Sequence, residues 1–220
     1  MSNFIKREWL LLLILFSSLV FAVVIYSYMP DQVPIHWNIE GEIDNYGSKA
    51  FGTFFIPLLN IGMYILFLVL PKLDPKKESY KEFERSYTII RYSMHIFMTV
   101  LFVVTVFASL GYNVDVSLWI AAGVAVLFIV MGSVMGKVKH NYFVGFKFPW
   151  TLANEEVWKK THYVGSKAMV WGGILAIIGV ILTEGTARFI ILMVGIFVPT
   201  ILTTVYSYLY FKKITNGSNK

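Results

Sequence analysis

The chain contains no cysteine, and charged residues make up only 15% of its 220 residues. The absence of cysteine excludes disulfides, thiolate nucleophiles and cysteine-ligated metals. The shortage of charge, set against 57% hydrophobic residues, excludes an ordinary soluble domain, because too little polar surface remains to cover one. The sequence therefore predicts a protein of the lipid bilayer.

The alternating apolar and polar strands of a membrane β-barrel are also missing from the sequence. Continuous apolar runs take their place, and a helix needs roughly 20 such residues to cross a hydrocarbon core about 30 Å thick. We therefore predict an all-α bundle of six transmembrane helices, which forms one integral membrane domain over residues 1–220. The predicted spans are 9–28, 51–70, 88–110, 117–136, 168–183 and 189–211.

The distribution of lysine and arginine predicts the orientation of these spans. With the N-terminus inside, nearly all of the 19 lysines and arginines fall on the cytoplasmic side, and only Lys49 and Arg188 fall outside. We predict a multi-pass membrane protein with both termini in the cytoplasm. Residues 29–50 then form an extracellular loop, and residues 71–87 and 137–167 form cytoplasmic loops.

The net charge of +6 is explained by this topology together with anionic lipid headgroups. Membrane lipids are therefore expected partners, and direct nucleic-acid binding is not expected. Small residues at four-residue spacing in the fourth and fifth spans predict close helix packing. These residues are Gly132 and Gly136, and Ala168, Gly172 and Ala176.

Charged residues are missing from the middle of the predicted spans. A transporter keeps such residues for a reason, because each costs about 2.5 to 3.5 kcal/mol on insertion scales. Arg91 and His95 share one face of the third span, but near its cytoplasmic end, where an arginine can snorkel to the surface. They fit either an anchor or a functional pair. A small-molecule permease or exporter is therefore the alternative function rather than the first.

Catalytic and metal motifs are missing as well. Glu155, Glu156, His140 and His162 supply acid, base or ligand atoms, but no HExxH or other close metal spacing occurs. No serine has an evident base partner. The sequence predicts no enzyme, no cofactor and no metal site.

Within the loop 71–87, Asp74 and Pro75 have the pattern of a helix N-cap followed by proline at the first helical position. Tyr80, Phe83 and Tyr87 then fall on one helical stripe. This pattern predicts a short helix lying in the inner headgroup region.

The loop 29–50 concentrates acids, aromatic residues and prolines. Apolar and polar residues alternate from Val33 to Ile39, which predicts a short extended segment, with Gly41 or Gly47 placed to turn it. An acidic and aromatic rim of this kind attracts a cationic or amphipathic ligand. It is equally typical of a solvated cap with Trp37 and Tyr46 in the membrane interface.

The loop 137–167 contains the most polar and aromatic stretch of the inner side, from 144 to 162. Pro149 and Trp150 lead into a helix that Thr151 or Asn154 is placed to cap. A seven-residue spacing separates Trp150 from Val157 and Val157 from Val164, which predicts an amphipathic helix on the inner membrane surface. Such a helix is either a membrane-lying connector or a docking site.

Residues 145–162 resemble the signature loop of the SdpI family of bacterial membrane immunity proteins. The outer loop resembles an N-terminal domain of unknown function that is common in that family, through a proline, His36, Trp37, Asn38, Gly41, Asp44 and the Gly-Ser-Lys ending at 47–49. The matching residues of the signature loop are Pro149, Trp150, Thr151, Leu152, Glu155, Glu156, Val157, Trp158, Lys160, Thr161 and His162. The chain departs from the family pattern at Lys147 and Phe148, where arginine and threonine are expected.

The resemblance implies a multi-pass integral protein of the bacterial plasma membrane that protects the producing cell from a secreted, membrane-active peptide toxin. It further implies inward signalling, in which a cytosolic winged-helix repressor is captured. We therefore predict a toxin-facing set on the outer loop and a partner-docking set on the signature loop. The toxin-facing set is His36, Trp37, Asn38, Glu40, Glu42, Asp44 and Lys49. The docking set is Pro149, Trp150, Thr151, Asn154, Glu155, Trp158, Lys160 and His162.

Overall fold

The computed structural model describes residues 3–217, and the side chains of residues 7–216. Within this part of the chain, six helices are long and apolar enough to cross a membrane, as the sequence predicts. They are α1 (Asn3–Ile25), α2 (Lys49–Leu73), α4 (Glu84–Ser109), α5 (Val116–Met135), α7 (Glu155–Leu182) and α8 (Gly185–Gly217). The shorter elements are η1 (Tyr26–Tyr28), β1 (Gln32–Trp37), β2 (Ile43–Ser48), α3 (Ser79–Glu82) and α6 (Pro149–Ala153).

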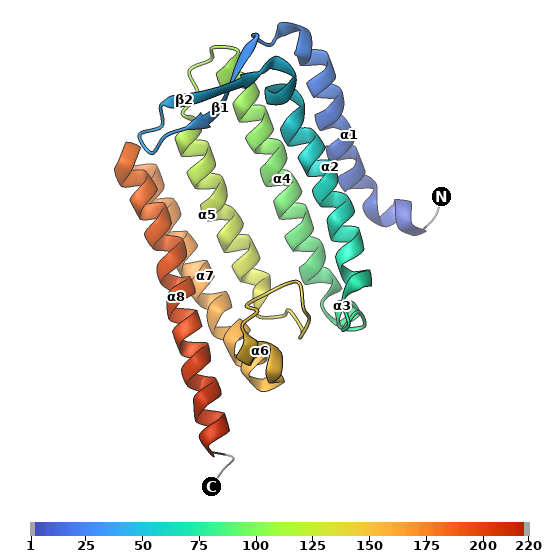
Figure 1. The fold of residues 1–220 in the computed structure, drawn as a ribbon, viewed down its shortest axis with the longest axis vertical. Helices are drawn as coiled ribbons and strands as arrows, with labels where there is room; N and C mark the ends of the chain where they lie inside the picture. The colour runs from blue at the N-terminus through green and yellow to red at the C-terminus, as the bar shows by residue number, and fades with distance from the viewer. Residues whose placement is uncertain (1–2, 218–220) are drawn as a thin grey trace.

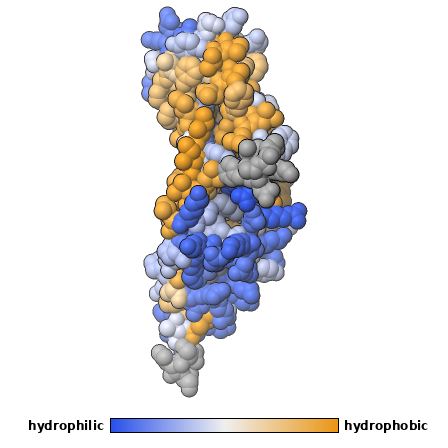
Figure 2. All heavy atoms as spheres, turned by 90° about the vertical axis from the view of Figure 1, so that its right-hand side faces the viewer, coloured by the Kyte–Doolittle hydropathy of each residue, from blue (hydrophilic) through white to orange (hydrophobic). Residues whose placement is uncertain are grey.

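The six long helices form two halves (Figure 1). Helices α1, α2 and α4 pack together, α5, α7 and α8 pack together, and the halves meet mainly along α4 and α5. The two strands lie at one end of the bundle, here named the hairpin end. Helices α3 and α6, the start of α1 and the end of α8 lie toward the other, here named the termini end (Figure 1). Figure 2 shows apolar side chains over the upper part of the α1 side and hydrophilic side chains gathered below.

Helices α7 and α8 pack closely through glycine, as the four-residue spacing predicts. A Cβ added at Gly172 would lie 2.4 Å from the carbonyl oxygen of Gly195 and 2.4 Å from the Pro199 ring. Only glycine permits this approach of two backbones, which provides dispersion contacts where lipid offers no hydrophobic driving force. Helices α7 and α8 therefore lie closer together than larger residues would allow.

The fifth span is much longer than the predicted 168–183, because α7 already begins at Glu155. Asn154 caps it, since the Asn154 side chain accepts hydrogen bonds from the backbone N–H groups of Glu156 and Val157. The first turns of α7 thus belong to the transmembrane helix itself. The prediction of a separate amphipathic helix lying on the membrane surface is wrong, although the predicted cap is confirmed.

The loop 71–87 contains a short helix, α3, as predicted, but the predicted cap and surface position are wrong. Asp74 is the C-cap of α2 rather than an N-cap, and α3 has only four residues. Tyr80, Phe83 and Tyr87 are buried in a cluster with Trp158 rather than exposed to headgroups. The aromatic stripe packs against protein because the segment between α5 and α6 covers it.

The outer loop folds into an antiparallel hairpin, the one sheet that residues 3–217 contain. Gln32 pairs with Ser48 and Trp37 with Ile43. Gly41 has φ +88° at the turn, a conformation that favours glycine. The predicted extended segment and its turn at Gly41 are therefore confirmed, and the hairpin is a small β addition to the helical bundle.

Candidate functional site

The hairpin is attached to the bundle through β1. Val33 is fully buried, and its side chain occupies the space where a Cβ on Gly52 of α2 would lie. Ser48 ends β2 and caps α2, because its hydroxyl oxygen accepts from the Phe51 N–H at 3.4 Å. The hairpin is thus fixed at its base on the first turn of α2.

The hairpin tip is held by side-chain hydrogen bonds. The amide oxygen of Asn38 accepts from the backbone N–H groups of Glu40, at 3.1 Å, and Glu42, at 2.9 Å. The Glu40 carboxylate accepts from the Thr186 hydroxyl at 3.3 Å, so the tip reaches the start of α8. The tip therefore spans from the half that carries the hairpin to the opposite half.

The predicted toxin-facing residues divide into two groups. His36, Glu40, Glu42 and Asp44 are exposed, and Trp37 and Asn38 are half-buried. His36 Nδ1 lies 2.5 Å from Asp44 Oδ1, across the two strands. Lys49 turns away from this rim, because its ammonium group lies over the Tyr26 ring, 5.1 Å from the centroid. The rim is therefore acidic.

A cleft of about 660 Å³ opens under the hairpin, between α2, α4 and α5. His36, Trp37 and Asn45 line it from the hairpin. Its other walls are mostly apolar and include Phe51, Phe55, Ile56, Leu59, Met98 and Leu101. The sequence gives no direct signal for this cleft, because its walls come from elements that are distant along the chain.

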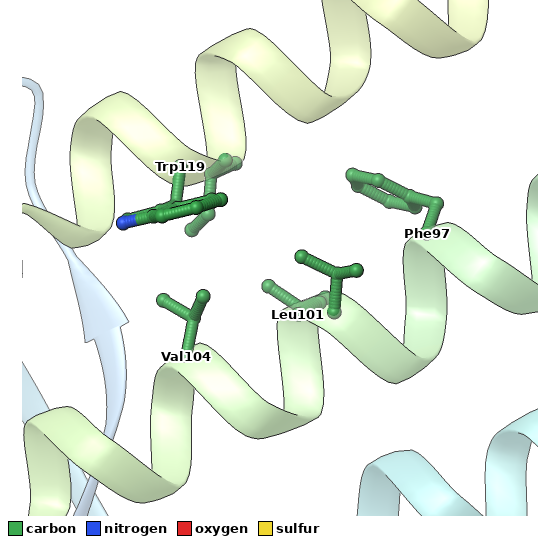
Figure 3. A pocket seen from close by; sticks show the side chains of 6 residues that line it. Phe97, Leu101, Val104 and Trp119 are labelled. Atoms are coloured by element: carbon green, nitrogen blue, oxygen red, sulfur yellow. The ribbon is translucent and has the colours of Figure 1, made fainter.

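The wall behind the cleft is the seam between α4 and α5. Phe97, Leu101 and Val104 of α4 and Trp119 of α5 converge on it (Figure 3), and they leave a void of only about 10 Å³. Leu101 also lines the cleft on the other side of this wall. One layer of apolar side chains thus separates the cleft from the outer surface of the seam.

At the termini end, the segment between α5 and α6 is organised by Asn141, which is fully buried. Its side-chain oxygen accepts from the backbone N–H groups of Phe143, at 2.9 Å, and Val144, at 2.7 Å. Its side-chain nitrogen donates to the carbonyl oxygens of Lys139 and Val144. One side chain therefore satisfies the backbone of a buried turn.

Asp74 joins this turn to the end of α2. Its carboxylate accepts from the Tyr142 N–H at 2.9 Å and from the Tyr80 hydroxyl at 3.1 Å. Burial, together with the charge of Asp74, raises the pKa of Tyr80. Lys76 Nζ lies 2.8 Å from His140 Nδ1. The pKa of His140 is lowered mainly by burial and next by the positive charge of Lys76. The two halves of the bundle are thus bridged at the termini end as well.

Trp158 lies between two histidines. Its ring centroid is 4.9 Å from that of His140 and 4.0 Å from that of His162. His162 Nε2 accepts from the Phe146 N–H at 3.0 Å, which leaves Nδ1 as the donor to the Trp158 carbonyl at 2.8 Å. Trp158 and His162 are 2% and 0% exposed. They hold the signature loop together and do not form part of its surface.

Thr151 is also fully buried, and its hydroxyl accepts from the Phe148 N–H and donates to the Phe146 carbonyl. Of the predicted docking residues, Pro149, Glu155 and Lys160 are exposed, and Trp150 and Asn154 are half-buried. The Trp150 indole N–H donates to the Ser207 hydroxyl at 2.8 Å, which ties α6 to α8. The exposed part of the set is therefore smaller than predicted.

An unexpected ion pair lies in the core of the half formed by α1, α2 and α4, here named the first half. Arg91 Nη2 and Nη1 donate to the two carboxylate oxygens of Glu8 at 2.5 and 3.1 Å, and the pair is almost fully buried. The prediction that Arg91 snorkels to the surface is wrong. His95 lies on the same face of α4, and its Nδ1 is 2.6 Å from the amide oxygen of Asn60. The sequence points to Arg91 and His95 of this network but not to Glu8, which stands just before an apolar run.

Two models of protein families match the chain. Residues 13–61 match a domain of unknown function, DUF1648, and residues 137–207 match the SdpI/YfhL protein family. The chain is 30% identical over 215 residues to Immunity protein SdpI of Bacillus subtilis (strain 168), an alignment that covers 97% of this chain and 99% of the relative. No solved structure matches the chain significantly. The chain is therefore a multi-pass protein of the plasma membrane that belongs to the SdpI/YfhL family.

Proposed function

We propose that this protein is a membrane immunity protein, which protects its cell by binding a secreted, membrane-active peptide in the cleft under the hairpin. Its relative is named an immunity protein and aligns over nearly the whole chain. The observation that carries the proposal is the cleft itself, about 660 Å³ in volume, open, and lined by the predicted residues His36 and Trp37.

The chemistry of the cleft suits an amphipathic, cationic peptide. The exposed carboxylates of Glu42 and Asp44 lie on the hairpin that forms the rim, and acidic rims attract cations from solution. Phe51, Phe55 and Met98 offer apolar area below, and apolar burial contributes roughly 25 cal/mol per Å². A peptide that would otherwise insert into lipid is thus offered an alternative apolar site.

The proposal is tested by comparing two aromatic substitutions on the same hairpin. Trp37→Ala removes an aromatic ring from the cleft, whereas Tyr46→Ala removes one that is 51% exposed and does not line it. Both variants are expressed in a Bacillus subtilis strain that lacks its own Immunity protein SdpI, and the cells are exposed to spent medium of the parent strain. We expect lost protection with Trp37→Ala alone. Full protection by Trp37→Ala would remove the cleft from the mechanism.

We further propose that the peptide-bound protein signals inward by capturing a cytosolic winged-helix repressor. This requires the termini end to face the cytoplasm, which the distribution of lysine and arginine supports. The available surface is the part of the predicted docking set that is exposed or half-buried, namely Pro149, Trp150, Asn154, Glu155 and Lys160. Reversing two charges, in Glu155→Lys with Lys160→Glu, is expected to abolish co-purification of the repressor. Unchanged co-purification would leave this surface without the role.

The alternative function, a small-molecule permease or exporter, requires a polar path through the bundle. The charged residues Glu8 and Arg91 neutralise each other near the termini end. The wall between α4 and α5 is apolar, with Leu101 and Trp119 in contact with the void. These observations favour peptide binding over transport.

A further inference from the structure

A second cavity lies at the termini end of the first half. It has a volume of about 530 Å³ and lies between the start of α1, the end of α2, α3 and the start of α4. Phe67, Leu68 and Pro71 form an apolar wall, and Tyr87 stands beside them, with its hydroxyl donating to the Phe67 carbonyl at 2.6 Å. The cavity therefore has an apolar side that continues along the transmembrane surface of α2.

The other side of the cavity is basic. Among the residues whose side chains are described, Arg7, Lys72, Lys81 and Arg91 line it, against the single acid Glu84. Both terminal nitrogens of Arg91 are used by the buried Glu8, so that pair forms a nearly neutral floor. Above this floor, three cations face one carboxylate.

Two of these cations are available for a ligand. Lys72 is exposed and has no hydrogen bond or ion pair within residues 7–216. Lys81 pairs only with Glu78, and both side chains are more than two-thirds exposed, so the pair contributes little that a ligand must overcome. Arg7 pairs with Glu84 at 2.9 Å, which keeps its guanidinium at the cavity. A phosphate group between the two lysines would meet positive charge without breaking a buried contact.

We infer that this cavity binds the headgroup of an anionic phospholipid. The inference is independent of the proposed immunity function. A phosphate is the shared chemistry, and a lipid rather than free phosphate is indicated, because the apolar wall accommodates the first carbons of an acyl chain. The cavity thus combines an apolar wall with charged residues at the termini end of the bundle. Basic pockets between transmembrane helices at the cytoplasmic surface are typical sites for such headgroups.

The test uses native mass spectrometry of the full-length protein, released from mixed micelles that contain equal amounts of phosphatidylglycerol and phosphatidylcholine. The wild type is expected to retain one phosphatidylglycerol preferentially. Lys72→Gln combined with Lys81→Gln is expected to lower that retention about thirtyfold, the combined effect of two lysines near an anionic headgroup. Lys212→Gln combined with Lys213→Gln removes the same charge from exposed positions of α8, and should change nothing.

Three results would overturn the inference. Equal retention in the cavity variant and in the wild type would show that the cavity is not the site, and equal losses in both double variants would reduce the effect to general surface charge. A third arm adds glycerol phosphate at the concentration of the lipid. Displacement of phosphatidylglycerol by this soluble anion would show that a phosphate ester without acyl chains is sufficient for binding, which would contradict the lipid assignment.

Discussion

Removal of the buried ion pair between Glu8 and Arg91 gives the sharpest test of the core. In Arg91→Ala, the Glu8 carboxylate, only 2% exposed, loses both hydrogen bonds from the guanidinium. Breaking one partner of a buried pair typically costs about 3–5 kcal/mol, because the other charge is left buried and uncompensated. Arg7 Nε remains 3.4 Å from Glu8, so we expect a cost near the lower value.

The double replacement Glu8→Met with Arg91→Met provides the informative comparison. Burying two apolar side chains of similar volume removes both the attraction and the desolvation cost, so the double variant should lie within about 1 kcal/mol of the wild type. Arg85→Ala, an exposed arginine on the same helix, is the control for loss of one charge.

Thermal unfolding of the detergent-solubilised protein, followed by tryptophan fluorescence, measures these differences. In a chain of this length, about 3 kcal/mol corresponds to a decrease in Tm of roughly 6–12 °C. Arg91→Ala should show this decrease, and Arg85→Ala and the double variant should not. If Arg91→Ala unfolds within about 1 °C of the wild type, the pair is not a buried structural contact.

Three further predictions concern the signature loop. A Cβ at Gly145, where φ is +120°, would lie 2.1 Å from His162 Nε2, so Gly145→Ala should lower the free energy of unfolding by more than about 2 kcal/mol. The control is Gly62→Ala, whose new Cβ meets nothing within 4 Å and which should unfold like the wild type. Burial and a neighbouring lysine lower the pKa of His140 in the folded state from the ordinary histidine value of 6.5, so below pH 6.5 the unfolded chain binds more protons than the folded chain. The free energy of unfolding should therefore fall as the pH drops from 7 toward 5, and it should fall less in His140→Gln. Asn154→Ala removes the cap of α7 and should cost about 1 kcal/mol by thermal unfolding, and a loss of zero would contradict the capping contacts.

The spans and the hairpin turn follow from the sequence because each depends on local chemistry. Apolar runs of sufficient length have one stable form in lipid, and Asn154 and Gly41 are the residue types that a helix cap and a positive φ require. Their identity therefore carries the structural information by itself.

The parts that the sequence does not predict depend on contacts between distant segments. Glu8 and Arg91 are 83 residues apart, and nothing near Arg91 indicates that its partner lies in the first helix. The sequence predicts Trp158 and His162 in a docking surface, but the turn around Asn141 covers them. Polarity in the sequence does not reveal whether a polar side chain faces water or a buried backbone.

The most direct test of the account is survival of cells that depend on this chain. A Bacillus subtilis strain that lacks its own Immunity protein SdpI is given either the full-length chain or an empty vector, with membrane insertion verified, and is then exposed to spent medium of the parent strain. We expect cells with the chain to keep growing and cells with the empty vector to die. Equal killing of the two strains would contradict the proposal that this protein confers immunity to the secreted peptide in that medium.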